Sequence, residues 1–197
     1  MALLTREDLA RQSRFAWLCL LALVATAAWF WSRDKGSASI GTLLSALGCL
    51  GLMLPPRERM PALPWRVRAL PRWLDGTAPL GALIVSPGYG LSWFYGVNPF
   101  DEVVHFVNGA LLGAVFAALL LADGVARSPA GLAWRGALFG LVLGVAWEIF
   151  EAATGLIGDF TDTWTDIVLG MAGAALAGWA AGPRLRTAVM SHGRAPG

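Results

Sequence analysis

Six ionisable residues at helical spacings are the candidates for chemistry in this sequence. They form three pairs, each near the end of an apolar run and each three or four residues apart: Asp101 and His105, Glu148 and Glu151, and Asp162 and Asp166. Residues at these spacings share one face of an α-helix, so each pair presents a polar stripe to one side. Carboxylates with one imidazole and no thiolate suit Mg²⁺, Mn²⁺, Ca²⁺ or iron, and they also accept Zn²⁺. The six residues therefore predict a divalent-metal site if the fold brings the three segments together.

Glu148 and Glu151 are the pair that ordinary helix chemistry explains least. They are expected in the last turns of a helix, where the helix dipole disfavours negative charge, and no Lys or Arg lies nearby on that side. A buried carboxylate without a partner takes up a proton or binds a cation. Asp101 and Asp162, by contrast, also fit the first turn of a helix, where acids are favourable without any ligand.

The composition places these residues in a helical membrane protein. Of the 197 residues, 56% are hydrophobic and 14% are charged, whereas soluble domains carry about 25% charged residues. A membrane-spanning helix needs about 20 mainly apolar residues. An all-α bundle of about six spans is predicted, and its third span is expected to be kinked, broken or re-entrant near SPGYG because of Pro87. The predicted spans are about 15–31, 38–55, 78–95, 103–122, 131–154 and 163–182.

The distribution of basic residues predicts the orientation of the spans. With the N-terminus in the cytoplasm, six crossings leave every Lys and Arg on the cytoplasmic side except Arg33 and Lys35, as the positive-inside rule requires. Five crossings would move two basic clusters to the opposite side. We therefore expect both termini in the cytoplasm and one integral membrane domain over 1–197. Its parts are an N-terminal part over 1–94, a part over 95–182 that carries the three pairs, and a basic tail over 183–197.

The cytoplasmic loop 56–77 has tryptophans and apolar residues between its arginines. Such a segment is expected to lie on anionic lipid headgroups through residues 57–72, although a plain retention signal explains the arginines equally well. The net charge of +2 is small, and no basic strip interleaved with aromatic residues occurs, so nucleic acid is not an expected partner. The oligomeric state stays open.

The predicted topology brings the three pairs to the extracytoplasmic side. With Asn98 as the expected cap of the fourth span, His105 lies roughly 10 Å inward from the helix end, and Glu148 and Asp166 lie at similar depth. Charged groups at such depth are expected to face the bundle interior, because exposure to lipid costs several kcal/mol. Small residues also recur every four positions in the last three spans, which allows close helix packing. They are Gly109 and Gly113, then Gly136, Gly140 and Gly144, and then Gly170, Ala174, Gly178 and Gly182.

The order of these motifs also resembles a known family. D-x-x-x-H-F (Asp101, His105, Phe106), E-x-x-E, D-x-x-x-D and a glycine-rich last helix are similar to the YjdF-like family of uncharacterised bacterial inner-membrane proteins, and more loosely to VanZ-like proteins. The resemblance covers about residues 95–182. It implies a multi-pass helical protein of the bacterial inner membrane and marks the same polar positions, but it implies no activity.

Three functions remain open from the sequence. The first is a metal-dependent membrane protein, which as an enzyme would hydrolyse or modify an envelope lipid or a phosphate substrate through a metal-activated water. The second is a transporter coupled to protons or cations, which would need a polar path toward the cytoplasm. The third is a structural or accessory membrane protein in which the polar residues only hold three helices together.

Overall fold

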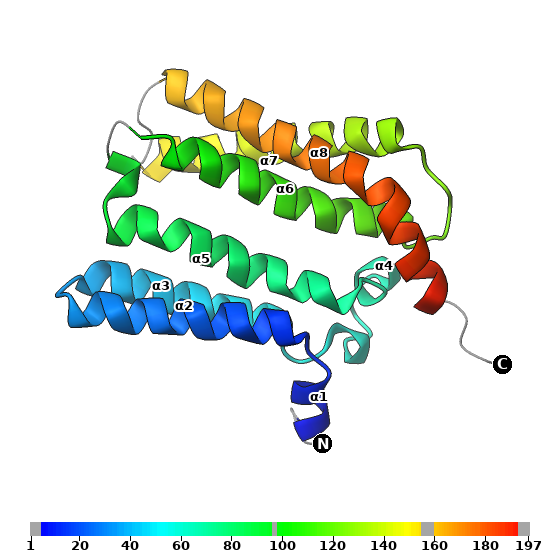
Figure 1. The fold of residues 1–197 in the computed structure, drawn as a ribbon, viewed down its shortest axis with the longest axis horizontal. Helices are drawn as coiled ribbons and strands as arrows, with labels where there is room; N and C mark the ends of the chain where they lie inside the picture. Colours follow the sequence, from blue (N-terminus) through cyan, green and yellow to red (C-terminus); the bar gives the residue numbers. More distant parts are fainter. Residues whose placement is uncertain (1–4, 96–97, 155–159, 193–197) are drawn as a thin grey trace. The chain divides into compact units, whose positions relative to one another are not determined.

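The computed structural model describes residues 5–95, 98–154 and 160–192, and every regular element in these ranges is a helix (Figure 1). The chain forms two compact units, Met1–Asn98 and Pro99–Gly197. Five helical stretches are long and apolar enough to cross a membrane: Arg14–Ser32, Gly36–Met53, Phe100–Leu121, Pro129–Thr154 and Asp162–Ala181. The prediction of an all-helical membrane protein is thus confirmed, and these five stretches begin and end within three residues of the predicted spans.

The first unit is built on three helices that pack against one another, α2 (Arg14–Ser32), α3 (Gly36–Met53) and α5 (Thr77–Gly90). Helices α2 and α5 run in the same direction and α3 runs opposite to them (Figure 1). Buried hydroxyls link the helices, because Ser39 Oγ donates a hydrogen bond of 2.7 Å to the backbone oxygen of Ala27. The core between them consists of Ala16, Leu20, Leu23, Ala46, Cys49 and Met53.

Helix α5 differs from the prediction for the third span. It runs through Pro87 without a break and ends at Gly90, so it has 14 residues. At about 1.5 Å per residue it is roughly 21 Å long, shorter than the hydrocarbon core of about 30 Å. The glycines of SPGYG serve as contact points, since an added Cβ would lie 2.0 Å from Phe94 at Gly88 and 1.9 Å from Phe30 at Gly90. The motif thus packs aromatic rings against α5, and the predicted break lies only at the end of the helix.

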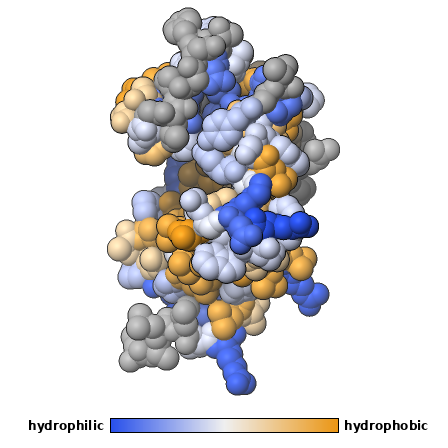
Figure 2. Space-filling model, turned by 90° about the vertical axis from the view of Figure 1, so that its left-hand side faces the viewer, coloured by the Kyte–Doolittle hydropathy of each residue, from blue (hydrophilic) through white to orange (hydrophobic). Residues whose placement is uncertain are grey.

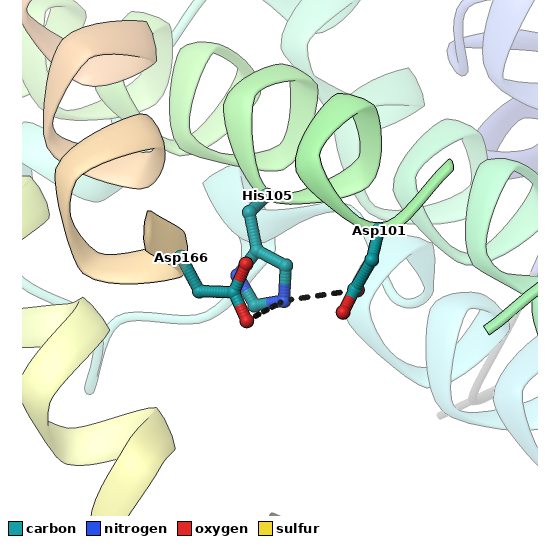
Figure 3. A group of neighbouring side chains, drawn as sticks. All are labelled: Asp101, His105 and Asp166. Carbon is teal, nitrogen blue, oxygen red and sulfur yellow. Dashed lines mark ion pairs between the residues drawn. The ribbon is translucent and has the colours of Figure 1, made fainter. Parts of the chain in front are cut away.

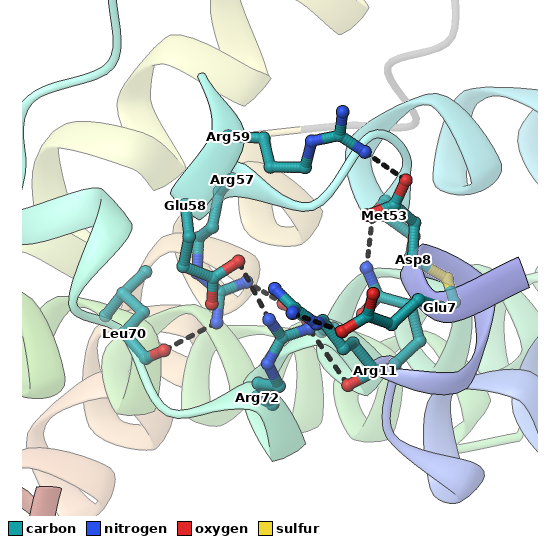
Figure 4. Close-up of polar contacts among 11 residues, drawn as sticks. Glu7, Asp8, Arg11, Met53, Arg57, Glu58, Arg59, Leu70 and Arg72 are labelled. Atoms are coloured by element: carbon teal, nitrogen blue, oxygen red, sulfur yellow. Dashed lines mark hydrogen bonds and ion pairs between the residues drawn. The ribbon is translucent and has the colours of Figure 1, made fainter. Parts of the chain in front are cut away.

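The arginines of the loop after α3 are largely occupied within the first unit (Figure 4). The loop contains η1 (Arg57–Arg59), α4 (Trp65–Arg68) and η2 (Arg72–Gly76), and a short helix α1 (Arg6–Ala10) precedes α2. Three of its arginines form ion pairs with acids of the same unit, which leaves less positive charge for lipid headgroups than the sequence suggests. The pairs are Arg57 with Asp75, Arg59 with Asp8, and Arg72 with Glu58.

The second unit consists of α6 (Phe100–Leu121), α7 (Pro129–Thr154) and α8 (Phe160–His192). Helix α8 packs against both others, parallel to α6 and antiparallel to α7 (Figure 1). The helices touch at small residues, because an added Cβ at Gly109 would lie 2.2 Å from the backbone oxygen of Gly170. The predicted role of these residues in close packing is confirmed at this interface.

Large apolar side chains cover the outer faces of the long helices in both units. Leu18 on α2, Leu44 on α3 and Val142 on α7 are 66%, 62% and 67% exposed. Figure 2 shows such hydrophobic side chains lying open on the surface beside hydrophilic ones. Apolar surface of this extent is unfavourable in water and favourable in lipid. The exposed faces therefore support a protein whose helices are surrounded by a bilayer.

Candidate metal centre

Three of the six predicted residues form a compact group in the second unit. His105 Nε2 lies 3.4 Å from Asp101 Oδ1 and 3.4 Å from Asp166 Oδ2. One nitrogen or oxygen atom from each of the three side chains lies within 4.8 Å of the other two. Figure 3 shows the imidazole of His105 directed at both carboxylates, with Asp101 on its own helix and Asp166 on α8.

The register between α6 and α8 accounts for this meeting. Gly109 faces Gly170, and Gly113 faces Ala174, so facing residues of these two parallel helices differ by 61 positions. One turn toward the helix starts, the same difference places His105 opposite position 166. The close contacts at these glycines thus set the register of α6 against α8 and bring the imidazole of His105 to the carboxylate of Asp166. Asp101 joins the group because it lies four residues before His105 on the same face.

Burial makes Asp166 the critical member of the group. The residue is 3% exposed, and its Oδ1 has no hydrogen-bond partner within the described parts of the chain. A buried carboxylate oxygen without a partner costs about 1–3 kcal/mol or more, because its hydration is lost and nothing replaces it. A cation at this position would replace the lost hydration. The buried, unpartnered oxygen of Asp166 is therefore what a metal ligand would present.

Glu148 borders this group from α7 without belonging to the compact set of three. The residue is 6% exposed, and its Oε1 also lacks a partner among the described residues. Glu148 is close enough to Asp166 to affect it electrostatically. The inward orientation expected for Glu148 is therefore present, and the residue brings a second buried acceptor oxygen toward the group.

Glu151 and Asp162 lie at the edge of the centre and are only half-buried. Glu151 interacts electrostatically with His105 and is influenced by the nearby side chain of Trp147, which the sequence analysis did not single out. The spacing of four residues between Trp147 and Glu151 was the feature of the sequence that could have indicated this contact. Asp162 lies one turn before Asp166 and acts on it electrostatically. Both acids raise the negative charge around the group without forming part of it.

The start of α6 differs from the predicted cap. The residue before the helix is Pro99, which provides no side-chain cap, whereas Asn98 Nδ2 donates a 2.9 Å hydrogen bond back to the backbone oxygen of Trp93. Asn98 therefore closes the preceding turn. Asp101 and Glu102 still lie in the first turn, where negative charge is favourable. Glu102 is exposed and does not contribute to the centre.

The donor set defines what the centre can bind. Neutral imidazole offers one lone pair at Nε2, and two carboxylates offer oxygen, which together suit a divalent ion of intermediate hardness. Three protein ligands leave further coordination positions for water, as in catalytic metal sites. Without an ion, the same atoms form a histidine–aspartate ion pair that links α6 to α8.

Comparison with known proteins identifies a family. The family model described as "Predicted membrane protein (DUF2238)" matches residues 13–187. This range includes the five long apolar stretches and all six predicted site residues. Neither the curated proteins nor the solved structures contain a match.

Proposed function

We propose that this chain, which belongs to the DUF2238 family of predicted membrane proteins, binds a divalent metal ion through Asp101, His105 and Asp166. The observation that carries the proposal is the buried Asp166 carboxylate, which has one oxygen 3.4 Å from His105 Nε2 and the other without a partner among the described residues. A cation would complete this arrangement, because it would offset the negative charge and be bound by ligand atoms that lie within 4.8 Å of one another.

In the proposed membrane arrangement, α5 also crosses the membrane as a short helix, which brings the number of crossings to six, and both termini lie in the cytoplasm. The basic residues support this arrangement, since six crossings keep all of them except Arg33 and Lys35 on one side. The metal centre then lies on the extracytoplasmic side of the membrane. A relationship to the YjdF-like proteins would imply that this membrane is the inner membrane of a bacterium. The basic segment 57–72 would contact anionic headgroups.

The position of exposed tryptophans supports a location near the membrane surface. Trp147 precedes Glu148, Trp164 lies two residues before Asp166, and the two tryptophans are 45% and 60% exposed. Tryptophan is enriched at the boundary between hydrocarbon and headgroups. A centre at this depth is within reach of lipid headgroups, and a bound divalent ion would supply an activated water or a polarised phosphate oxygen. We therefore propose an envelope lipid or its phosphate as the substrate class.

Elemental analysis tests the metal proposal directly. The full chain is purified in detergent after metal loading with Mn²⁺, Zn²⁺, Fe²⁺, Mg²⁺ or Ca²⁺ offered together, and bound metal is measured per chain. We expect at least one ion in the wild type and in Glu102→Gln, an exposed acid of the same first turn that serves as the matched control. We expect loss of that ion in His105→Ala and Asp166→Asn.

Two results would contradict the proposal. One is a wild-type chain without stoichiometric metal after loading. The other is unchanged metal content in both His105→Ala and Asp166→Asn. If the wild type holds no metal and both variants unfold at lower temperature, the group is instead a structural ion pair between α6 and α8. Size-exclusion profiles of each variant show whether a loss of metal reflects a loss of fold.

A further inference from the structure

The second unit contains two buried carboxylate oxygens that have no hydrogen-bond donor among the described residues. They are Asp166 Oδ1 on α8 and Glu148 Oε1 on α7. We infer that a second divalent cation binds between these two carboxylates, with Asp166 bridging it to the ion held by Asp101 and His105. This inference rests on the proposed function, because the bridge requires the first ion on the other oxygen of Asp166.

The register between α7 and α8 places Glu148 at this position. An added Cβ at Gly140 would lie 2.8 Å from the Cα of Met171, and one at Gly144 would lie 3.3 Å from the Cα of Ile167. Four residues forward on α7 therefore correspond to four residues backward on α8, as expected for antiparallel helices. Glu148 is one turn beyond Gly144 on the same face, so it lies against the turn of α8 that ends at Asp166.

The chemistry of the two oxygens excludes a simple hydrogen bond between ionised side chains. An ionised carboxylate is acceptor-only, so two of them repel each other unless a proton or a cation lies between them. His105 is directed through Nε2 at the other oxygen of Asp166, at 3.4 Å. No Lys or Arg occurs in 98–108 or 144–166, the segments that carry the six residues. A cation between these two oxygens would therefore come from outside these segments.

The charge of the whole centre favours two ions over one. Five carboxylates and one imidazole interact electrostatically with one another in this centre. One divalent ion would offset two negative charges of the ionised acids, whereas two ions would leave one uncompensated. Carboxylate-bridged ions about 3.5–4 Å apart are a recurring arrangement in proteins that bind phosphate groups. The five acids are Asp101, Glu148, Glu151, Asp162 and Asp166.

Titration with Mn²⁺ tests the second ion. Free Mn²⁺ is counted by electron paramagnetic resonance during titration of the detergent-purified full chain, and the bound ions are then examined for magnetic coupling. We expect two Mn²⁺ per wild-type chain with a spectrum of two coupled ions. In Glu148→Gln, which keeps the side-chain volume, we expect one uncoupled ion and an affinity for the second ion that is lower by about 100-fold or more. Glu102→Gln is the matched control and retains both ions.

The possible outcomes separate this inference from the proposed function. One Mn²⁺ in the wild type, with no change in Glu148→Gln, overturns the second ion and leaves the first. One Mn²⁺ in the wild type that is lost in Glu148→Gln also overturns it, because Glu148 is then a fourth ligand of a single ion. No bound Mn²⁺, Zn²⁺ or other divalent ion in the wild type overturns both. The unfolding temperature of Glu148→Gln without metal shows whether the fold is intact.

Discussion

Replacing Gly109 by alanine should weaken metal binding although Gly109 is not a ligand. Its added Cβ would lie 2.2 Å from the backbone oxygen of Gly170, whereas ordinary contact begins at 3.4 Å. One contacting atom is a backbone oxygen and the other is a Cβ atom fixed to the backbone, so neither can rotate away. Helix α6 must therefore move from α8 by about 1 Å, and His105, one turn away, moves with it.

The size of this effect follows from the geometry of metal sites. Metal–ligand distances vary by only about 0.2 Å around their ideal values, so a shift of about 1 Å breaks or strains the bond from His105. Overpacking of a tight contact costs about 1–3 kcal/mol. If this cost falls on the metal-bound state, affinity drops by about 5- to 150-fold, since 1.4 kcal/mol corresponds to a factor of ten.

Competition of the chain with a fluorescent chelator measures this change in affinity. Two controls add the same methyl group without the same clash. In Gly170→Ala the new Cβ would lie 3.8 Å from the backbone oxygen of His105, and in Gly48→Ala, on α3, it would meet nothing within 4 Å. Alanine also favours a helix over glycine by about 1 kcal/mol, so the controls should bind metal normally and unfold at the same or a higher temperature.

Equal metal affinity of Gly109→Ala and the wild type would refute this reasoning. It would mean that the contact between Gly109 and Gly170 does not set the position of His105. Loss of metal in Gly170→Ala as well would also contradict it, because that substitution meets only ordinary contact distances.

Two further predictions concern the ion pairs of the first unit. Arg57→Ala should lower the free energy of unfolding by about 3–5 kcal/mol, because it removes the ion-pair partner of Asp75, whose side chain is 6% exposed. Thermal unfolding measures this change. Partial recovery of stability in the double variant with Asp75→Ala would distinguish an uncompensated charge from lost packing. The backbone hydrogen bond from Thr5, supported by Arg59, lowers the pKa of Asp8. A lowered folded-state pKa stabilises the fold above the unfolded value near 3.8, and this contribution is lost as the pH falls through the folded-state pKa. Asp8→Asn should therefore flatten the decrease in unfolding temperature between about pH 5 and pH 2, and a decrease as steep as in the wild type would show that Asp8 does not contribute.

The sequence predicted the long helices because their signal is local and extensive. Eighteen or more apolar residues in succession leave the backbone no alternative to a helix in lipid, so α2, α3, α6, α7 and the apolar part of α8 were found. The errors concern single positions at helix ends. The break expected near SPGYG lies at Gly90, the last residue of the motif, and not at Pro87, through which α5 continues. Asn98 suggested a cap, but Pro99 occupies that position. Both depend on contacts beyond the helix itself, with Phe30 and Phe94 at the end of α5 and with Trp93 before α6, which the helical pattern does not reveal.

The candidate site shows the same division. The pairing of Asp101 with His105 follows from the period of the α-helix, and the sequence determined it without any other helix. That Asp166 completes the group, while Glu148 borders it, depends on the registers of α8 against α6 and α7. Those registers are set by close contacts of glycine backbones across helices, which sum over many positions and cannot be read from one segment. The sequence thus determined which side chains share a helical face and predicted that His105, Glu148 and Asp166 lie at similar depth. Only the tertiary structure decided which faces meet and in what register.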